Sequence, residues 1–205
     1  MRALLLVDLQ NDFMPGGPMG VAGGMDTVAV ANRLMPYFDQ VIATQDLHPL
    51  DHGSFITQHP GAQVGELVTL GGLPQTVWPV HCVQGTAGAA LHGDLDQARV
   101  TKVFPKGTDP SVDSYSGFFD NGKRHATGLG DYLVQQGVRQ VYVMGLATDY
   151  CVKATAMDAA ELGFQTFLVV DGCRAVNLEP DDGMRALQTM EHAGIQLVTS
   201  EALGQ

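Results

Sequence analysis

Short apolar runs of strand length, separated by helical patterns, constrain the fold of this chain more than any other feature. Residues 3–7 and 141–144 are continuously apolar, which is typical of central strands in a parallel sheet that is covered on both faces. Strands that alternate with helices indicate a doubly wound, mostly parallel six-stranded sheet with helices on both faces, a three-layer α/β/α architecture. The strands are predicted at residues 3–7, 40–44, 99–104, 140–144, 164–170 and 195–199, and the helices at 26–38, 128–137, about 151–163 and 180–193.

The length of 205 residues predicts a single domain over residues 1–205. Residues from about 46 to 86 show little periodicity and are punctuated by prolines and paired glycines. A long irregular stretch inside a compact domain is usually functional, so we expect this region to contribute to a site.

Composition excludes several classes of protein. The net charge of −11 argues against a nucleic-acid partner, because phosphate binding requires clustered lysine and arginine. Three cysteines do not suggest a disulfide framework, and no apolar run reaches the length of a membrane span. The start of the chain reads as a strand and not as a signal peptide. We therefore expect a cytoplasmic protein with reduced thiols and no membrane partner.

Cys151 follows the apolar strand 141–144 and the chain-breaking Gly145, and an alanine-rich helical segment comes after it. With Thr148 or Asp149 as N-cap, Cys151 would lie in the first turn of a helix. Free backbone N–H groups and the helix dipole would then lower the pKa of the thiol. The segment alone fits either a nucleophile or a small buried apolar side chain.

Two further chemical groups follow predicted strands. Asp8 comes directly after residues 3–7, and Lys106 comes shortly after residues 99–104. Since ligands bind at the carboxyl ends of parallel strands, we expect both groups to lie near Cys151. Together they suit acyl transfer, with Asp8 taking the thiol proton and Lys106 favouring the thiolate. Taken singly, Asp8 also reads as a turn residue and Lys106 as a surface charge.

Asp46 and His48 form an Asp-x-His pair just after the predicted strand 40–44, and His81 lies in the irregular region. One carboxylate and two imidazoles suit a single divalent ion, with Zn²⁺ as the first expectation and Fe²⁺ or Mn²⁺ also compatible. His52 and His59 are further candidates for the metal site. Cys82 is treated as structural, because its side chain should point away from that of His81 in an extended segment.

These residues lie in segments that resemble the nicotinamidase/pyrazinamidase branch of the isochorismatase-like cysteine hydrolases. The resemblance runs in order from residue 3 to about residue 200. It is carried by DLQNDF at 8–13, TQDLHP at 44–49, WPVHCVQG at 78–85, KG at 106–107 and GLATDYCV at 145–152.

The resemblance implies that Asp8, Lys106 and Cys151 hydrolyse nicotinamide to nicotinate and ammonia through a thioester acyl-enzyme, in NAD salvage. Pyrazinamide would be a further substrate. It also implies one metal ion on Asp46, His48 and His81, and a homo-oligomer is compatible with the fold.

The resemblance further assigns the surroundings of the substrate. Phe13, Trp78 and Tyr115 match family positions that wall the ring. A cis peptide at Leu146–Ala147 is implied, with the backbone N–H groups of Ala147 and Cys151 forming the oxyanion hole. This chain has Val80 where many relatives carry an acidic or different residue. His52 or Ser54 would then supply the extra contact at the metal site.

Two other functions fit parts of the pattern. One is an amidase of the same superfamily that acts on a carbamoyl or ureido substrate, although such relatives usually lack the Asp-x-His and second histidine set. The other is a non-enzymatic α/β binding or redox module, which would leave Asp8 and Lys106 without a role.

Overall fold

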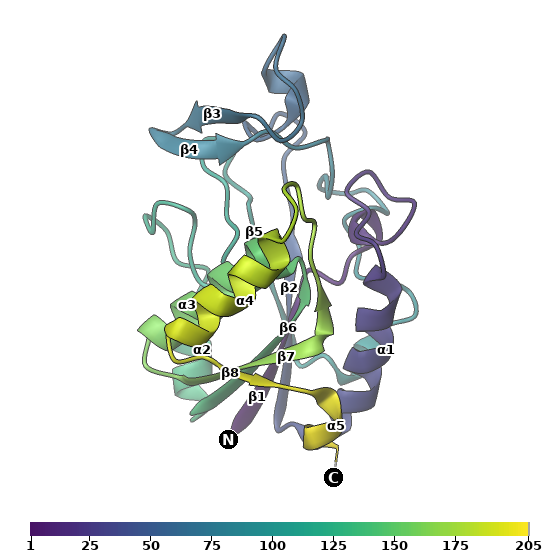
Figure 1. Cartoon of the computed structure of the whole chain (residues 1–205), viewed down its shortest axis with the longest axis vertical. Coiled ribbons are helices and arrows are strands. Elements are labelled where there is room, and N and C mark those ends of the chain that lie inside the picture. Colours follow the sequence, from purple (N-terminus) through teal and green to yellow (C-terminus); the bar gives the residue numbers. More distant parts are fainter. Residues whose placement is uncertain (205) are drawn as a thin grey trace.

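The computed structural model describes residues 1–204, and its centre is a six-stranded sheet in which all neighbouring strands are parallel (Figure 1). The strand order is β5-β2-β1-β6-β7-β8. These strands are β1 (Arg2–Val7), β2 (Gln40–Asp46), β5 (Lys102–Lys106), β6 (Gln140–Leu146), β7 (Gln165–Arg174) and β8 (Gln196–Val198). The predicted doubly wound fold is confirmed.

Helices cover both faces of the sheet, as predicted. In Figure 1, α1 and α5 lie on one side of the sheet, and α2, α3 and α4 lie on the other. The helices are α1 (Gly24–Leu34), α2 (Leu129–Gln135), α3 (Lys153–Glu161), α4 (Asp182–His192) and α5 (Ser200–Leu203). The core strands carry buried aliphatic side chains, and β1 is buried from Ala3 to Val7. None of the helices in residues 1–204 has the length and apolarity to span a bilayer.

The irregular region contains a small second sheet that the sequence did not reveal. Strands β3 (Leu67–Leu70) and β4 (Leu73–Thr76) form an antiparallel hairpin, and Figure 1 shows it at the end of the molecule away from both termini. Gly71 and Gly72, with φ of 58° and 84°, make the two-residue turn. Positive φ at both central positions suits such a hairpin turn. Each strand has only four residues, and β4 contains Pro74, so periodicity gave no signal.

Strand β5 begins and ends later than residues 99–104. Residues Gln97–Arg99 form a 3-10 turn, and β5 continues through Pro105 to Lys106. Proline is tolerated there because β5 lies at the edge of the sheet, where one row of N–H groups has no partner strand. The consequence is that Lys106 belongs to the strand itself and pairs in register with Asp46 of β2.

Candidate active site and metal centre

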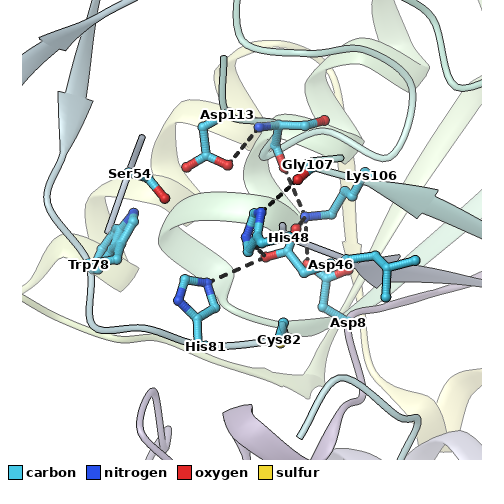
Figure 2. Close-up of polar contacts among 12 residues, drawn as sticks. Asp8, Asp46, His48, Ser54, Trp78, His81, Cys82, Lys106, Gly107 and Asp113 are labelled. Carbon is cyan, nitrogen blue, oxygen red and sulfur yellow. Dashed lines mark hydrogen bonds and ion pairs between the residues drawn. The ribbon is translucent and has the colours of Figure 1, made fainter. Parts of the chain in front are cut away.

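The carboxyl ends of four adjacent strands bring the predicted chemical groups together (Figure 2). Asp8 directly follows β1, while Asp46 and Lys106 end the neighbouring strands β2 and β5. Strand β6 leads into the turn that carries Cys151. Parallel strands end at a common edge, so residues far apart in sequence converge without any local signal.

Lys106 is the centre of this group of side chains. Its ammonium Nζ lies 2.9 Å from Asp8 Oδ2 and 2.6 Å from Asp46 Oδ1, and it donates to the Ser114 carbonyl at 2.9 Å. The Lys106 side chain is fully buried. Burial alone would lower the pKa of Lys106, but the two carboxylates raise it well above its ordinary value. Lys106 is therefore held in its protonated form between the carboxyl groups of Asp8 and Asp46.

Asp8 is also fully buried, and each of its carboxylate oxygens has a different environment. Thr44 donates its hydroxyl to Oδ1 at 2.6 Å. Within residues 1–204, no donor is aligned for a hydrogen bond to Oδ2, although the Lys106 ammonium is close to it. Burial raises the pKa of Asp8, and Lys106 only partly offsets this. Oδ2 is thus an available proton acceptor beside a cation.

Cys151 lies in a π-helical turn, Thr148–Val152, that precedes α3, and not in the first turn of an α-helix. The predicted N-caps are wrong, because Ala147 takes that position and the Asp149 carboxylate accepts hydrogen bonds from Val176 N and Asn177 N. The residue Cys151 is 7% exposed, and burial raises the pKa of its thiol well above the ordinary value despite Lys106.

The lowered thiol pKa predicted from the sequence is therefore wrong, since loss of hydration outweighs the nearby cation. The thiol nevertheless has the expected neighbours. Sγ lies 3.5 Å from Lys106 Nζ and within 4.8 Å of carboxylate oxygens of Asp8 and Asp46. A neutral thiol beside a buried carboxylate can lose its proton in the same step in which it attacks.

Asp46, His48 and His81 form the compact group that the sequence predicted. Asp46 Oδ2 lies 3.4 Å from His48 Nε2 and 3.8 Å from His81 Nε2. Ligand atoms about 2.1 Å from one ion lie about 3–3.5 Å apart, so the three donors are near the spacing that a common ion requires. Residues in this group are at most 4% exposed.

The hydrogen bonds behind the histidines fit a metal ion. His48 Nδ1 lies 2.7 Å from the Gly107 carbonyl, and His81 Nδ1 lies 2.7 Å from the Pro79 carbonyl. A carbonyl only accepts, so both Nδ1 atoms carry the proton and both Nε2 atoms are directed at Asp46. Burial alone would lower the pKa of His48, but Asp46 raises it to about 9. The Asp46 carboxylate therefore favours a positive charge next to His48 Nε2, whether a proton or a metal ion supplies it.

The backbone conformation of Gly107 allows the Asp46–His48–His81 group to form. Gly107 has a φ of 64°, and a Cβ there would come within 2.4 Å of His48 Cε1. Only glycine fits both restraints, so the residue after Lys106 allows His48 to approach the strand end. The peptide bond Leu146–Ala147 is cis, as the resemblance implied.

His52 and Ser54 lie beside this group and contact each other. The Ser54 backbone N–H donates to His52 Nδ1 at 3.3 Å, and the Ser54 hydroxyl lies 2.7 Å from the same nitrogen. The rings of His48 and His52 have centroids 4.2 Å apart. His59 faces elsewhere and contacts the Gly53 carbonyl at 2.6 Å. Cys82 is buried, and its backbone N–H donates to Asp12 at 2.7 Å.

A pocket opens beside the Cys151 side chain and the Asp46–His48–His81 group. All three predicted ring-wall residues line it, as do Ala147, Asp46 and His81. Sequence reasoning missed four lining residues: Met19, Asp113, Tyr150 and Val176. Tyr150 could have been found from its place next to Cys151, but the others lie in loops without a distinctive pattern.

Comparison with known proteins gives consistent results. Residues 2–202 match the isochorismatase domain family. A nicotinamidase of Escherichia coli K12 is 52% identical over 202 residues, which cover 97% of this chain and 94% of that protein.

Two solved structures are similar over nearly their whole length. A nicotinamidase/pyrazinamidase of Acinetobacter baumanii has a TM-score of 0.95 and 40% identity, covering 98% of this chain and 97% of that one. A pyrazinamidase of Pyrococcus horikoshii in complex with zinc has a TM-score of 0.79 and 36% identity, covering 97% and 98%.

Proposed function

The chain belongs to the isochorismatase family, and from this membership we propose that it is a nicotinamidase, an amidohydrolase that converts nicotinamide to nicotinate and ammonia. The observation that carries the proposal is the convergence of Asp8 and Lys106 on Cys151, which lines a pocket together with Asp46 and His81 of the proposed metal-ligand group. An amidase of ureido substrates would not require that second group. Pyrazinamide, which differs from nicotinamide by one ring nitrogen, is proposed as a second substrate.

We propose that Cys151 is the nucleophile and Asp8 the general base. As Sγ bonds to the amide carbon, the thiol proton passes to Asp8 Oδ2, which lies next to the Lys106 ammonium. Asp8 then donates this proton to the leaving nitrogen, so that ammonia departs and a thioester remains. In the second half, Asp8 takes a proton from water as the water oxygen attacks the thioester carbon. The carbon–sulfur bond then breaks, nicotinate leaves, and Asp8 returns the proton to Sγ of Cys151. Lys106 stabilises the anionic states of Asp8 and Cys151.

The turn that carries Cys151 also suits the developing oxyanion. Ala147 and Cys151 both line the pocket, and their backbone N–H groups are the proposed donors to the carbonyl oxygen. Phe13, Trp78 and Tyr115 are the proposed walls for the flat pyridine ring. Both assignments agree with an aromatic carboxamide whose reactive carbon lies above Sγ.

Asp46, His48 and His81 are the proposed ligands of one divalent ion, and zinc is the first candidate because the Pyrococcus horikoshii relative binds it. Such an ion would supply a Lewis-acidic position for the lone pair of the pyridine nitrogen. His52 and Ser54 are the proposed residues beside it. Lys106 also contacts Asp46, so one side chain adjoins both the metal group and the nucleophile.

The test is hydrolysis by purified protein. Incubation with nicotinamide should release ammonia and nicotinate in equal amounts, and Cys151→Ala should abolish both. A burst of ammonia before steady state would report the thioester intermediate. Full activity in Cys151→Ala would contradict the mechanism, and failure of the wild-type protein to hydrolyse nicotinamide with its metal present would contradict the function.

A further inference from the structure

Asp113 is a pocket residue to which the mechanism gives no role. It is 3% exposed and lines the pocket together with Cys151 and His81. One of its oxygens lies within 4.8 Å of a ring nitrogen of His48. In the view of Figure 2, Asp113 and Trp78 lie on the opposite side of His48 from Asp8. A buried carboxylate requires partners that hold it in place.

Gln75 of β4 is the side chain that holds Asp113. Its Nε2 donates to Asp113 Oδ2 at 2.9 Å and to the Thr76 carbonyl at 2.8 Å. Both partners only accept hydrogen bonds, so the side-chain amide must present its NH₂ group to them. The Ser114 backbone N–H donates to the other Asp113 oxygen, Oδ1, at 2.8 Å. Gln75 itself is 2% exposed, and water does not compete for this contact.

The same amide group reaches the aromatic wall of the pocket. Gln75 Nε2 lies 3.2 Å from Tyr115 Oη, and Trp78 Nε1 donates to Tyr115 Oη at 3.1 Å. Gln75 therefore connects the Asp113 carboxylate to Tyr115 and, through Tyr115, to Trp78, which are two of the three proposed ring walls. The Gln75 contacts start from the β3–β4 hairpin, which lies outside the main sheet.

We propose that Gln75 is a positioning residue that fixes Asp113, Tyr115 and Trp78 as one polar wall of the pocket and thereby sets how tightly the aromatic carboxamide is bound. The inference rests on the proposed function for the identity of the ligand. Gln75 contacts none of Asp8, Lys106 and Cys151 in the hydrogen bonds above, so it acts on binding and not on the chemical step. Loss of the contact should raise KM and leave kcat nearly unchanged.

The first variant is Gln75→Met, which keeps the volume and removes the hydrogen bonds. We expect KM for nicotinamide to rise about tenfold while kcat stays within about threefold. The dissociation constant of nicotinate, measured by calorimetry, should rise in parallel, and bound metal should stay unchanged. Thr69→Val, at an exposed position of the same hairpin, is the matched control and should leave both constants unchanged.

The second pair of variants tests the contact with Asp113 directly. Gln75→Glu places a carboxylate against the Asp113 carboxylate and should raise KM more than Gln75→Met does. Combining Gln75→Glu with Asp113→Asn restores the total charge and one hydrogen bond, with the donor now at position 113. The double variant should therefore bind nicotinate more tightly than Gln75→Glu alone.

Three results would overturn the inference. They are an unchanged KM in Gln75→Met, a double variant no better than Gln75→Glu, and a KM change that tracks metal loss. An inactive wild-type protein would instead contradict the proposed function. In that case nicotinate binding by wild type and Gln75→Met still decides whether Gln75 shapes the pocket.

Discussion

At the scale of single residues, Lys106 explains why a buried site with several carboxylates is stable. Its ammonium is paired with Asp8 and Asp46, both almost completely buried. Removing one partner of a buried ion pair leaves an uncompensated charge, which is costly. The pKa of the Cys151 thiol is raised for a related reason. Burial raises it, and the Lys106 cation, which also pairs with Asp8 and Asp46, does not offset that effect. Alkylating reagents react with the thiolate, so a raised pKa predicts slow alkylation of Cys151 near neutral pH. Slow alkylation would therefore not argue against Cys151 as the nucleophile.

The first prediction concerns Gly107. Gly107→Ala adds a methyl group against the His48 ring at a position with φ of 64°. Gly137→Ala is the matched control, because it adds a methyl group in open space at a similar φ of 70°. Both changes should lower stability by about 1 kcal/mol through the backbone. Only Gly107→Ala should lose metal and activity, by at least tenfold, as measured by metal analysis and ammonia release. Equal activity in the two variants would contradict the role of Gly107.

The second prediction is a pH dependence set by Asp8. Burial raises the pKa of Asp8, so its protonated form persists at a higher pH than for an exposed aspartate. Because the base form is required, kcat/KM should fall as the pH falls through this raised pKa, with a midpoint above that of an exposed aspartate. The profile should be recorded at two metal concentrations. A midpoint that shifts with the metal concentration would instead report metal loss.

At the scale of elements, the site depends on how loops are tied to strand ends. The 3-10 turn Asn11–Phe13 follows β1 and reaches the loop that carries His81. Asp12 accepts the Cys82 backbone N–H at 2.7 Å, and the rings of Phe13 and His81 have centroids 5.5 Å apart. One short turn thus fixes both a proposed ring wall and a proposed metal ligand.

The third prediction tests this connection. Asp12→Ala removes the acceptor for Cys82 N–H and should weaken metal binding about tenfold or more, since outer contacts orient the ligands. Asn11→Ala is the matched control, because Asn11 is adjacent and its side-chain amide donates to the Ala87 carbonyl of the same loop region. The metal dissociation constant of each variant is the measurement. Similar constants in both variants would show that the Asp12 contact does not position His81.

At the scale of the whole molecule, the ends of the main-sheet strands position the proposed catalytic groups, and several loops, among them the irregular region that carries Trp78 and His81, supply the pocket wall. The chain folds around a six-stranded parallel sheet, and four of its adjacent strands, β5, β2, β1 and β6, end at the site. The proposed metal ligands Asp46 and His48 lie at the end of β2 and just after it, and His81 lies in a separate loop. A bound ion would link these segments and should therefore stabilise the fold as well as bind substrate. The homo-oligomer that the resemblance suggests stays a prediction.

The fourth prediction is the effect of metal removal. Chelation should abolish activity and lower Tm by about 5–15 °C, because an ion present at 100–1,000 times its dissociation constant contributes about 3–4 kcal/mol. The fold should persist, since Lys106 and a protonated His48 compensate the charge of Asp46. Circular dichroism and calorimetry are the measurements. Cys151→Ala, which removes no metal ligand, should show the same fall in Tm; an unchanged Tm after complete metal removal would contradict this account.

The sequence by itself determined the fold class and the candidates for the catalytic and metal-ligand residues. Uninterrupted apolar runs indicated the central parallel strands, and Asp8, Asp46 and Lys106 were recognisable because each follows a predicted strand. These signals are local, since a strand and the residue that ends it are neighbours in the chain. The same logic found Cys151 after β6 but misjudged its turn and its pKa.

Only the tertiary structure decided the environment of these groups. Burial of the Cys151 thiol, the shared contacts of Lys106 and the spacing of Asp46, His48 and His81 depend on strand order and register, which no local pattern encodes. The β3–β4 hairpin was missed because its strands are short and half-exposed. Gln75 and Asp113 were missed because their roles arise from a contact across 38 residues of sequence.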